Sequence, residues 1–413
     1  MSNKPLVGAA IIGQSGGPSS VINCSAYGVI KTALEAECIT TVYGANHGIR
    51  GVLDDKLMIM DEEDPKELER LLWTPSSALG SCRYKIADPD VDDTDYKRIL
   101  EIFQKYNVRY FFYNGGNDSM DTCNKISKYM KKVGYDCRVM GVPKTIDNDL
   151  FGTDHCPGFA SAAKYIATSV MEVARDSRVY NIGQITIIEC MGRHAGWLTA
   201  AAALANAKEP CCDFIYLPEV DFDMDKFVAD VSACYKKNGS CIVAVSEGIH
   251  YADGKFVSEA KTSGTDGFGH AQLGGLAALL ANVLKEKTGA KVRGIELSLL
   301  QRCAAHCASQ TDIDEAFCAG KTAVEEMIKG TTDKMVGFAC DRTNGYKCEM
   351  KLFDLSDCAN FEKKFPREWI NAEGNFVTHD FIDYALPLIQ GEPKLPKEDS
   401  LPRFARLKKV LAK

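Results

Sequence analysis

Two apolar segments that each run into a pair of glycines constrain the fold of this chain more than any other feature. One lies around residues 7–12 and the other is VRYFFYN at 108–114; the pairs are Gly16–Gly17 and Gly115–Gly116. Short apolar runs bounded by turn residues are typical of buried strands. We expect helices to open after them, at residues 18–20 and near Ser119. Each segment therefore predicts a strand, a tight turn and a helix, whose amides and positive helix end suit a phosphate.

Similar apolar runs recur along the chain, with helix-like stretches between them: TTVYGAN, RVMGVPK, NIGQITIIEC, CIVAVSE and RGIELSLL. This alternation predicts an α/β fold with mainly parallel sheets covered by helices. A chain of 413 residues has room for two domains. Its net charge of −7 gives no sign of a nucleic-acid surface. An acidic protein that binds polyanions must gather its cations locally.

The segment PKTIDND at 143–149 contains a candidate catalytic carboxylate, Asp147. Phosphoryl transfer needs a base for the attacking hydroxyl and backbone amides, cations and metal ions for the donor phosphates. The glycine loops lack the Gly-Lys-Ser/Thr of a Walker loop and the G-x-G-x-x-G of a dinucleotide site. Asp147 and Asp149 could instead form an Asx turn around Asn148, and Lys144 could be a solvated surface lysine.

Seven short motifs make the chain resemble the phosphofructokinase A family, whose members transfer a phosphoryl group to O1 of fructose 6-phosphate. In order they are SGG (15–17), GSCR (80–83), GGNDS (115–119), KTIDND (144–149), MGR (191–193), SEG (246–248) and LQR (300–302). The resemblance implies two Rossmann-like three-layer domains with the active site in the cleft between them. Residues 1–160 with about 301–355 would form the phosphoryl-donor domain, and about 161–300 with 356–413 the fructose 6-phosphate domain.

Two positions bear on the choice of donor. ATP-dependent relatives typically have glycine where this chain has Asp118 and Lys144, and the Asp/Lys combination resembles the pyrophosphate-dependent branch. A carboxylate at Asp118 would lie where the α-phosphate of ATP binds. Two like charges about 4 Å apart at an effective dielectric near 20 repel by roughly 4 kcal/mol. Lys144 would offer a mobile cation to the phosphate that leaves when pyrophosphate is split.

The resemblance also assigns roles to individual residues. The catalytic set would be Asp147 as general base with Lys144, Asp118 and Arg193. The donor would be held by Gly16, Gly17, Arg83, Gly116 and Ser119. Fructose 6-phosphate would be held by Thr145, Ile146, Met191, Gly192, Arg193, Glu247, Arg293 and Arg302, the arginines suiting a phosphate dianion. Mg²⁺ is the implied cofactor, with Asn117 and Asp149 near it.

Three positions depart from the bacterial ATP-dependent pattern. Asn117 stands where a metal-binding aspartate is usual, Gln184 where a partner subunit's arginine is common, and Leu299 where a histidine is common. Because some phosphate-binding arginines of this family come from a neighbouring subunit, we expect a homodimer or homotetramer. Two other functions stay open: an ATP-dependent enzyme that tolerates Asp118, and a non-catalytic sugar-phosphate-binding regulatory subunit. Loss of Asp147 would have marked the second.

The setting of the protein is also predicted. No apolar run approaches the twenty residues that a membrane helix needs, and no secretory signal is evident. Seventeen cysteines without a Cys-x-x-Cys spacing suit a reducing compartment. We therefore expect a cytoplasmic protein that meets neither membranes nor nucleic acids, and whose substrates are pyrophosphate and fructose 6-phosphate.

Overall fold

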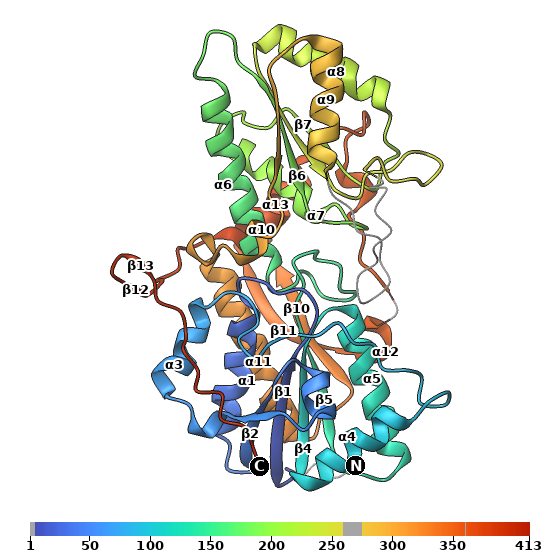
Figure 1. Cartoon of the computed structure of the whole chain (residues 1–413), viewed down its shortest axis with the longest axis vertical. Helices are drawn as coiled ribbons and strands as arrows, with labels where there is room; N and C mark the ends of the chain where they lie inside the picture. Colours follow the sequence, from blue (N-terminus) through green and yellow to red (C-terminus); the bar gives the residue numbers. More distant parts are fainter. Residues whose placement is uncertain (1–4, 259–274, 360) are drawn as a thin grey trace.

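The chain forms two parts, each built on its own sheet and stacked along the long axis of the molecule (Figure 1). The computed structural model describes residues 5–258, 275–359 and 361–413. Within these residues the larger sheet has seven strands in the order β11-β10-β5-β4-β1-β2-β3, and the smaller has four in the order β7-β8-β6-β9. The predicted α/β fold with mainly parallel sheets is confirmed.

The larger sheet is parallel except at its two edges, where β3 and β11 run antiparallel to their neighbours. Its strands are β1 (Gly8–Gln14), β2 (Ile39–Ala45), β3 (Leu57–Ile59), β4 (Val108–Gly115), β5 (Arg138–Pro143), β10 (Lys334–Asp341) and β11 (Lys347–Asp354). The smaller sheet is wholly parallel. Its strands are β6 (Ile185–Cys190), β7 (Phe214–Tyr216), β8 (Cys241–Ser246) and β9 (Val292–Glu296). A short pair, β12 (Lys397–Glu398) and β13 (Leu401–Pro402), lies near the C-terminus.

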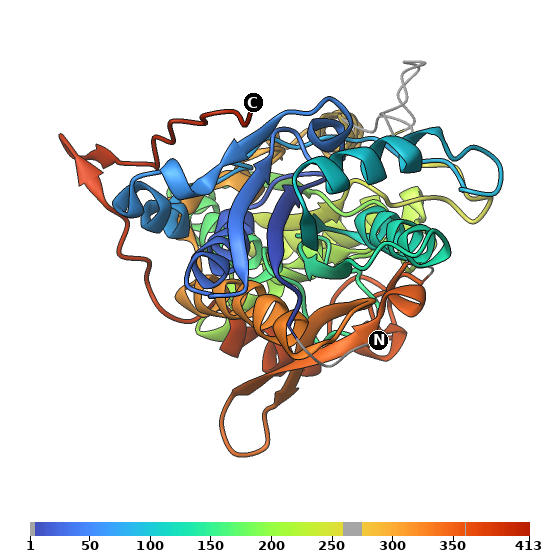
Figure 2. The same ribbon diagram turned by 90° about the horizontal axis from the view of Figure 1, so that it is seen from below.

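Helices cover both faces of both sheets, because the central strands are buried on both sides. On the larger sheet, α1 (Ile22–Leu34) and α11 (Gln310–Lys329) cover one face, and α4 (Thr94–Lys105) and α5 (Asn117–Lys132) the other (Figure 2). On the smaller sheet, α6 (Phe159–Ser177) lies opposite α8 (Met224–Asn238) and α9 (Leu276–Thr288) (Figure 1). The shorter helices are α2 (Ile49–Leu53), α3 (Pro65–Glu69), α7 (Trp197–Ala200), α10 (Leu300–Cys303), α12 (Leu355–Cys358) and α13 (His379–Ala385). None of the described helices has the length and apolar character needed to cross a membrane.

Strand register determines which loops meet. Gln14 at the end of β1 lies beside Asn114 of β4, and Gly115 lies beside Pro143 at the end of β5. The loops after these strands therefore emerge side by side. In the smaller sheet the ends of β6 and β8 are likewise paired, Cys190 with Ser246. Ligands of open α/β sheets bind outside these carboxyl ends.

Most of the predicted strands are found, but three local boundaries differ. The first helix begins at Ile22, not at residues 18–20, which are irregular. Conversely, α5 begins at Asn117, so Asn117, Asp118 and Ser119 form its first turn. The last predicted strand, RGIELSLL, is shorter: β9 ends at Glu296 and α10 begins at Leu300.

The end of the chain returns to the larger sheet. Ile59 N donates to Val410 O at 2.8 Å, and Ala412 N donates to Leu57 O at the same distance. The segment thus covers the edge strand β3, whose backbone groups would otherwise be unpaired. It differs in this respect from residues 365–389, whose buried side chains pack in the core beside the smaller sheet. Residues 365–389 and the end of the chain thus pack against different sheets.

Candidate active site

A cavity of about 700 Å³ opens between the two parts, where the carboxyl ends of the two sheets face each other. Fourteen of the residues predicted for the site line it: Gly16, Gly17, Arg83, Gly116, Asn117, Asp118, Ser119, Lys144, Thr145, Asp147, Asp149, Met191, Arg193 and Glu247. Segments far apart in the sequence therefore meet at one polar cavity, the default candidate for an active site.

The glycine loops are shaped by close contacts. A Cβ at Gly115 would lie 1.9 Å from Ser119 Oγ, so no side chain fits there. Gly16 has φ of +77°, and a Cβ on it would come within 3.3 Å of Lys144 Nζ. Gly116 precedes α5, so the first turn of this sixteen-residue helix, with its positive end, faces the cavity. The combination suits a bound anion.

Lys144 lies beneath the first glycine loop and is only 5% exposed. Burial lowers the pKa of its ammonium to about 8, although Asp147 and Asp149 favour the charged form. Its backbone N donates to Gly115 O at 3.0 Å, which ties the segment after β5 to the end of β4. The alternative that Lys144 is a solvated surface lysine is wrong, because its side chain is buried.

Two carboxylates, Asp147 and Asp149, lie at the cavity floor. The pKa of Asp147 is raised to about 7, chiefly by burial and then by the nearby charges of Asp149 and Glu247, while Lys144 and Arg302 oppose the shift. Burial and the charge of Glu362 also raise the pKa of Asp149. Asp147 N donates to Thr145 Oγ1 at 3.1 Å, a local turn that presents the first carboxylate. A base with a pKa near neutrality is well matched to general-base catalysis.

Asn117 provides an oxygen that suits a cation. Its Nδ2 donates to Asp149 Oδ2 at 3.4 Å. Its Oδ1 is buried and has no hydrogen-bond partner among the described residues. Carboxylate and amide oxygens are the ligands that Mg²⁺ accepts in proteins. The described part of the chain also has two clusters of three potential ligand atoms, Asp154 with His155 and Cys340, and Asp213 with Cys234 and Cys241, and neither includes a residue lining this cavity.

The smaller sheet contributes a second set of polar groups. Gly192 N donates to Glu247 Oε1 at 3.3 Å, and Ser246 Oγ donates to Gly192 O at 2.6 Å. These bonds hold the MGR and SEG segments together. Burial raises the pKa of Glu247. Within the described residues Arg193 Nε has no hydrogen-bond partner, so it is available to an incoming acceptor.

Arg302 reaches across to the larger sheet. A Cβ at Gly17 would lie 3.0 Å from its Nη1. Burial lowers the pKa of Arg302, and the nearby charge of Arg83 lowers it further. Arg83 and Arg302, which were predicted to bind different substrates, therefore lie close enough for the charge of one to affect the other. Such neighbouring cations are stable beside a polyanion and repel each other without one.

Several predicted residues lie elsewhere or play another part. Ile146 is 7% exposed and packs in the core beside the smaller sheet, not on the cavity wall. Arg293 Nε donates to Gln184 Oε1 at 3.2 Å, and neither residue lines the cavity of this chain. Leu299, which stands where a histidine is common in bacterial ATP-dependent relatives, is 56% exposed.

Five lining residues were not predicted: His194, Ala359, Phe361, Glu362 and Lys364. His194 directly follows the MGR motif and could have been found from it. The others follow α12, where Lys363 N donates to Asp149 O at 2.8 Å. Their sequence resembles ordinary polar surface, and contacts with the distant loop at 149–154 bring them to the cavity.

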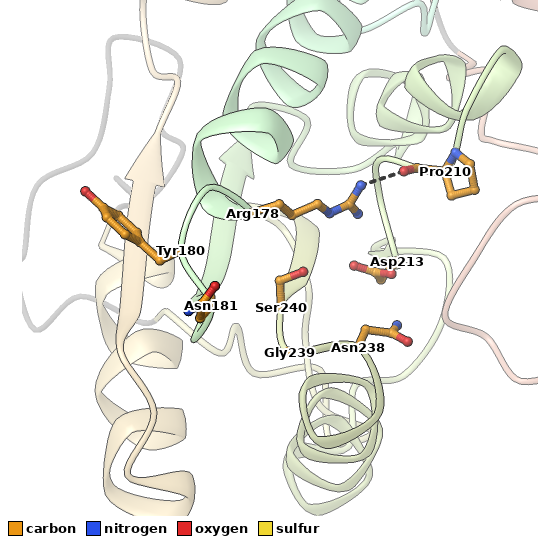
Figure 3. A pocket seen from close by; sticks show the side chains of 9 residues that line it. Arg178, Tyr180, Asn181, Pro210, Asp213, Asn238, Gly239 and Ser240 are labelled. Carbon is orange, nitrogen blue, oxygen red and sulfur yellow. Dashed lines mark hydrogen bonds between the residues drawn. The ribbon is translucent and has the colours of Figure 1, made fainter.

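A second pocket, of about 420 Å³, lies at the opposite ends of the smaller sheet's strands (Figure 3). Its arginine, Arg178, donates to Pro210 O at 2.8 Å and to Cys211 O at 3.2 Å, and Asp213 lines the same pocket. The guanidinium is thus already engaged by carbonyls. Its lining has one cation and one carboxylate, whereas the first cavity has several of each.

The comparisons with known proteins agree with this geometry. The family model "Phosphofructokinase" matches residues 9–326. The pyrophosphate–fructose 6-phosphate 1-phosphotransferase of Halomonas elongata is 43% identical over 97% of this chain and 96% of its own length. That of Methylococcus capsulatus is 42% identical, with 96% and 95% covered. The crystal structure of a pyrophosphate-dependent phosphofructokinase from Marinobacter aquaeolei superposes with a TM-score of 0.89 at 39% identity, covering 98% of both chains. With a matching family model over most of its length and relatives alike from end to end, this chain belongs to the phosphofructokinase family.

Proposed function

We propose that this enzyme transfers a phosphoryl group reversibly from pyrophosphate to O1 of fructose 6-phosphate, giving fructose 1,6-bisphosphate and orthophosphate. One observation carries the proposal: a buried lysine and a pair of carboxylates lie directly beneath two glycine loops in one cavity. The names of relatives more than 40% identical over nearly the whole chain support the same reaction. Because pyrophosphate is a weaker donor than ATP in cells, the enzyme would serve both glycolysis and gluconeogenesis.

In the proposed mechanism Asp147 takes the proton from the 1-hydroxyl as that oxygen attacks the transferring phosphorus. Its raised pKa makes it a better proton acceptor than an ordinary aspartate. Lys144 and Arg193 would meet the negative charge that develops on the transferring and leaving oxygens. Asp118, at the rim of the cavity, would disfavour the α-phosphate of ATP.

The two ends of the cavity would hold different substrates. Gly16, Gly17, Arg83, Gly116 and Ser119 would bind the donor. Thr145, Met191, Gly192, Glu247 and Arg302 would bind the sugar phosphate, with Ile146 supporting the segment from behind. Arg293, at the edge strand β9, would act only toward a neighbouring subunit. Exposed apolar side chains flank this strand, Tyr180 and Ile182 before β6 and Leu299 and Leu300 after β9, which supports a homo-oligomer.

Asn117 and Asp149 would hold Mg²⁺. When bound, the ion would neutralise part of the donor's charge. The buried oxygen of Asn117, which has no hydrogen-bond partner among the residues that the structure describes, supports this assignment. We also propose that the part built on the larger sheet is the donor domain and the other the fructose 6-phosphate domain. Seventeen free thiols support a reducing cytoplasm.

The test is product formation with purified protein. Fructose 6-phosphate, Mg²⁺ and pyrophosphate as sole donor should give fructose 1,6-bisphosphate, and fructose 1,6-bisphosphate with orthophosphate should give pyrophosphate. Asp147→Asn, which keeps the shape of the side chain, is the control against a contaminating activity. Absence of product in both directions from folded wild type would refute the proposal.

A further inference from the structure

Asn148 lies between the two carboxylates and faces away from the cavity. It is fully buried and has φ of +56°, in the left-handed region that asparagine tolerates better than most residues other than glycine. Its Oδ1 accepts a hydrogen bond from Cys156 N at 2.9 Å. Its Nδ2 donates to Tyr384 Oη, also at 2.9 Å. The surrounding structure therefore holds the backbone between Asp147 and Asp149 in an unusual conformation.

Tyr384 comes from α13, which lies 236 positions later in the sequence than Asn148. Its hydroxyl donates to Asp154 O at 2.8 Å while it accepts from Asn148. Its ring packs against Trp197 and Trp369, with centroids 5.4 and 5.3 Å apart. The bond between Asn148 and Tyr384 is buried, so the position of Asn148 is coupled to this aromatic cluster.

Lys363 and Arg342 form hydrogen bonds with the rest of the loop that contains Asn148. Lys363 N donates to Asp149 O at 2.8 Å, and Lys363 Nζ donates to Asp154 O at 2.6 Å. Arg342 binds both carboxylate oxygens of Asp154 at 2.8 Å, and its Nε donates to Tyr384 O at 3.1 Å. These contacts converge on residues 148–154 and leave the Asp147 carboxylate facing the cavity.

We propose that Asn148 and Tyr384 are positioning residues: the hydrogen bond between their side chains fixes the directions of the Asp147 and Asp149 carboxylates for the reaction. Neither Asn148 nor Tyr384 lines the cavity, so they act through the backbone of the loop. The inference rests on the proposed function, because it gives Asp147 the role of base. Small misplacement of a reacting group can cost a hundredfold in rate while substrate binding persists.

The test is Tyr384→Phe, which keeps the ring and removes the hydroxyl. We expect kcat to fall by about ten- to a hundredfold, with KM for both substrates within about threefold of wild type. Tyr135→Phe is the matched control. Its hydroxyl also bonds to two backbone oxygens, of Phe103 and Val108, both at 2.9 Å, but in the core of the larger sheet. It should leave kcat within twofold. A purely structural role for Tyr384 would give the two variants similar losses of Tm and similar kcat.

A second variant covers the case in which Tyr384→Phe does not fold. Asn148→Gly keeps the left-handed backbone accessible and removes the amide, and it should lower kcat by a similar factor. Because both changes break the bond between Asn148 and Tyr384, the loss of kcat in the double variant should be smaller than the product of the two single losses. All variants and wild type are assayed with pyrophosphate and with ATP. If wild type used only ATP, the proposed donor would be wrong. The effect of the variants on kcat would then be measured with ATP. Active wild type with either folded variant retaining more than half of kcat would overturn the positioning role.

Discussion

Asp118 and Lys85 form an ion pair at the cavity rim, with Oδ1 of Asp118 3.6 Å from Nζ of Lys85. Both side chains are substantially exposed, at 42% and 62%, so the pair itself contributes little to stability. Lys144, in contrast, is buried beneath the glycine loop. Because the ion pair contributes little to stability, replacing Asp118 should change the choice of donor without unfolding the protein.

We expect Asp118→Gly to raise the ratio of kcat/KM for ATP to that for pyrophosphate by at least tenfold, because a repulsion of roughly 4 kcal/mol with the α-phosphate is removed. Lys144→Gly should cripple the pyrophosphate reaction without creating a good ATP enzyme. The double variant should have the highest ratio, and the effects should not add, since both residues act at one phosphate site. Asp121→Gly, one turn later on α5 and outside the cavity lining, is the control. An unchanged ratio in Asp118→Gly would contradict the account of donor choice.

Asp147→Asn should lower kcat by 10² to 10⁴, or about 3 to 5 kcal/mol, because the amide cannot accept the proton. Binding of fructose 6-phosphate, measured by calorimetry, should stay within about threefold, since the variant keeps the shape of the site. A variant that kept more than a third of wild-type turnover would show that another group is the base.

Arg302→Ala should raise KM for fructose 6-phosphate by about ten- to a hundredfold and affect KM for pyrophosphate much less, because a charge-assisted contact to phosphate is worth about 1.5 to 3 kcal/mol. Arg83→Ala should do the reverse. Arg50→Ala, which removes an exposed pair with Asp54 and a contact with the Tyr84 ring, both outside the cavity lining, is the control. Because Arg302 lies close to Gly17 and Arg83, which are predicted to bind the donor, the test must separate effects on two neighbouring substrates. Equal effects on both substrates would mean that the two ends of the site are misassigned.

His155 should make stability depend on pH. Burial alone lowers the pKa of this imidazole, but hydrogen bonds to Asp154, Cys340 and Glu315 outweigh it and hold the pKa well above its ordinary value. The favourable contribution is therefore complete below pH of about 6.5, the unfolded value, and declines as pH rises toward the folded value. His155→Gln should cost about 3 kcal/mol at pH 6 and less at pH 9 in urea unfolding.

His379→Gln is the control for that measurement, since His379 is 77% exposed in its pair with Asp383. It should cost little at either pH. If the cost of His155→Gln were equal at the two pH values, or larger at pH 9, the imidazole would not be held as a cation in the folded protein.

The strands and the phosphate loops could be predicted because their signals are local: an apolar run, a glycine pair and a helix start lie within about twenty residues of one another. The meeting of the loops then follows from parallel strand order. The contributions of Glu362, Lys364 and Tyr384 could not be predicted, because they depend on contacts between segments about two hundred residues apart. The burial of Lys144 was missed for a related reason: it depends on the neighbouring glycine loop, not on the residues around it in sequence.

The most direct test of the account is donor competition in wild type. Initial rates of fructose 1,6-bisphosphate formation should be measured with pyrophosphate and with ATP, each as sole donor, at matched Mg²⁺ and saturating fructose 6-phosphate. The account predicts that kcat/KM for pyrophosphate exceeds that for ATP by about a thousandfold, the equivalent of the roughly 4 kcal/mol repulsion at Asp118. Equal use of the two donors, or a preference for ATP, would contradict it.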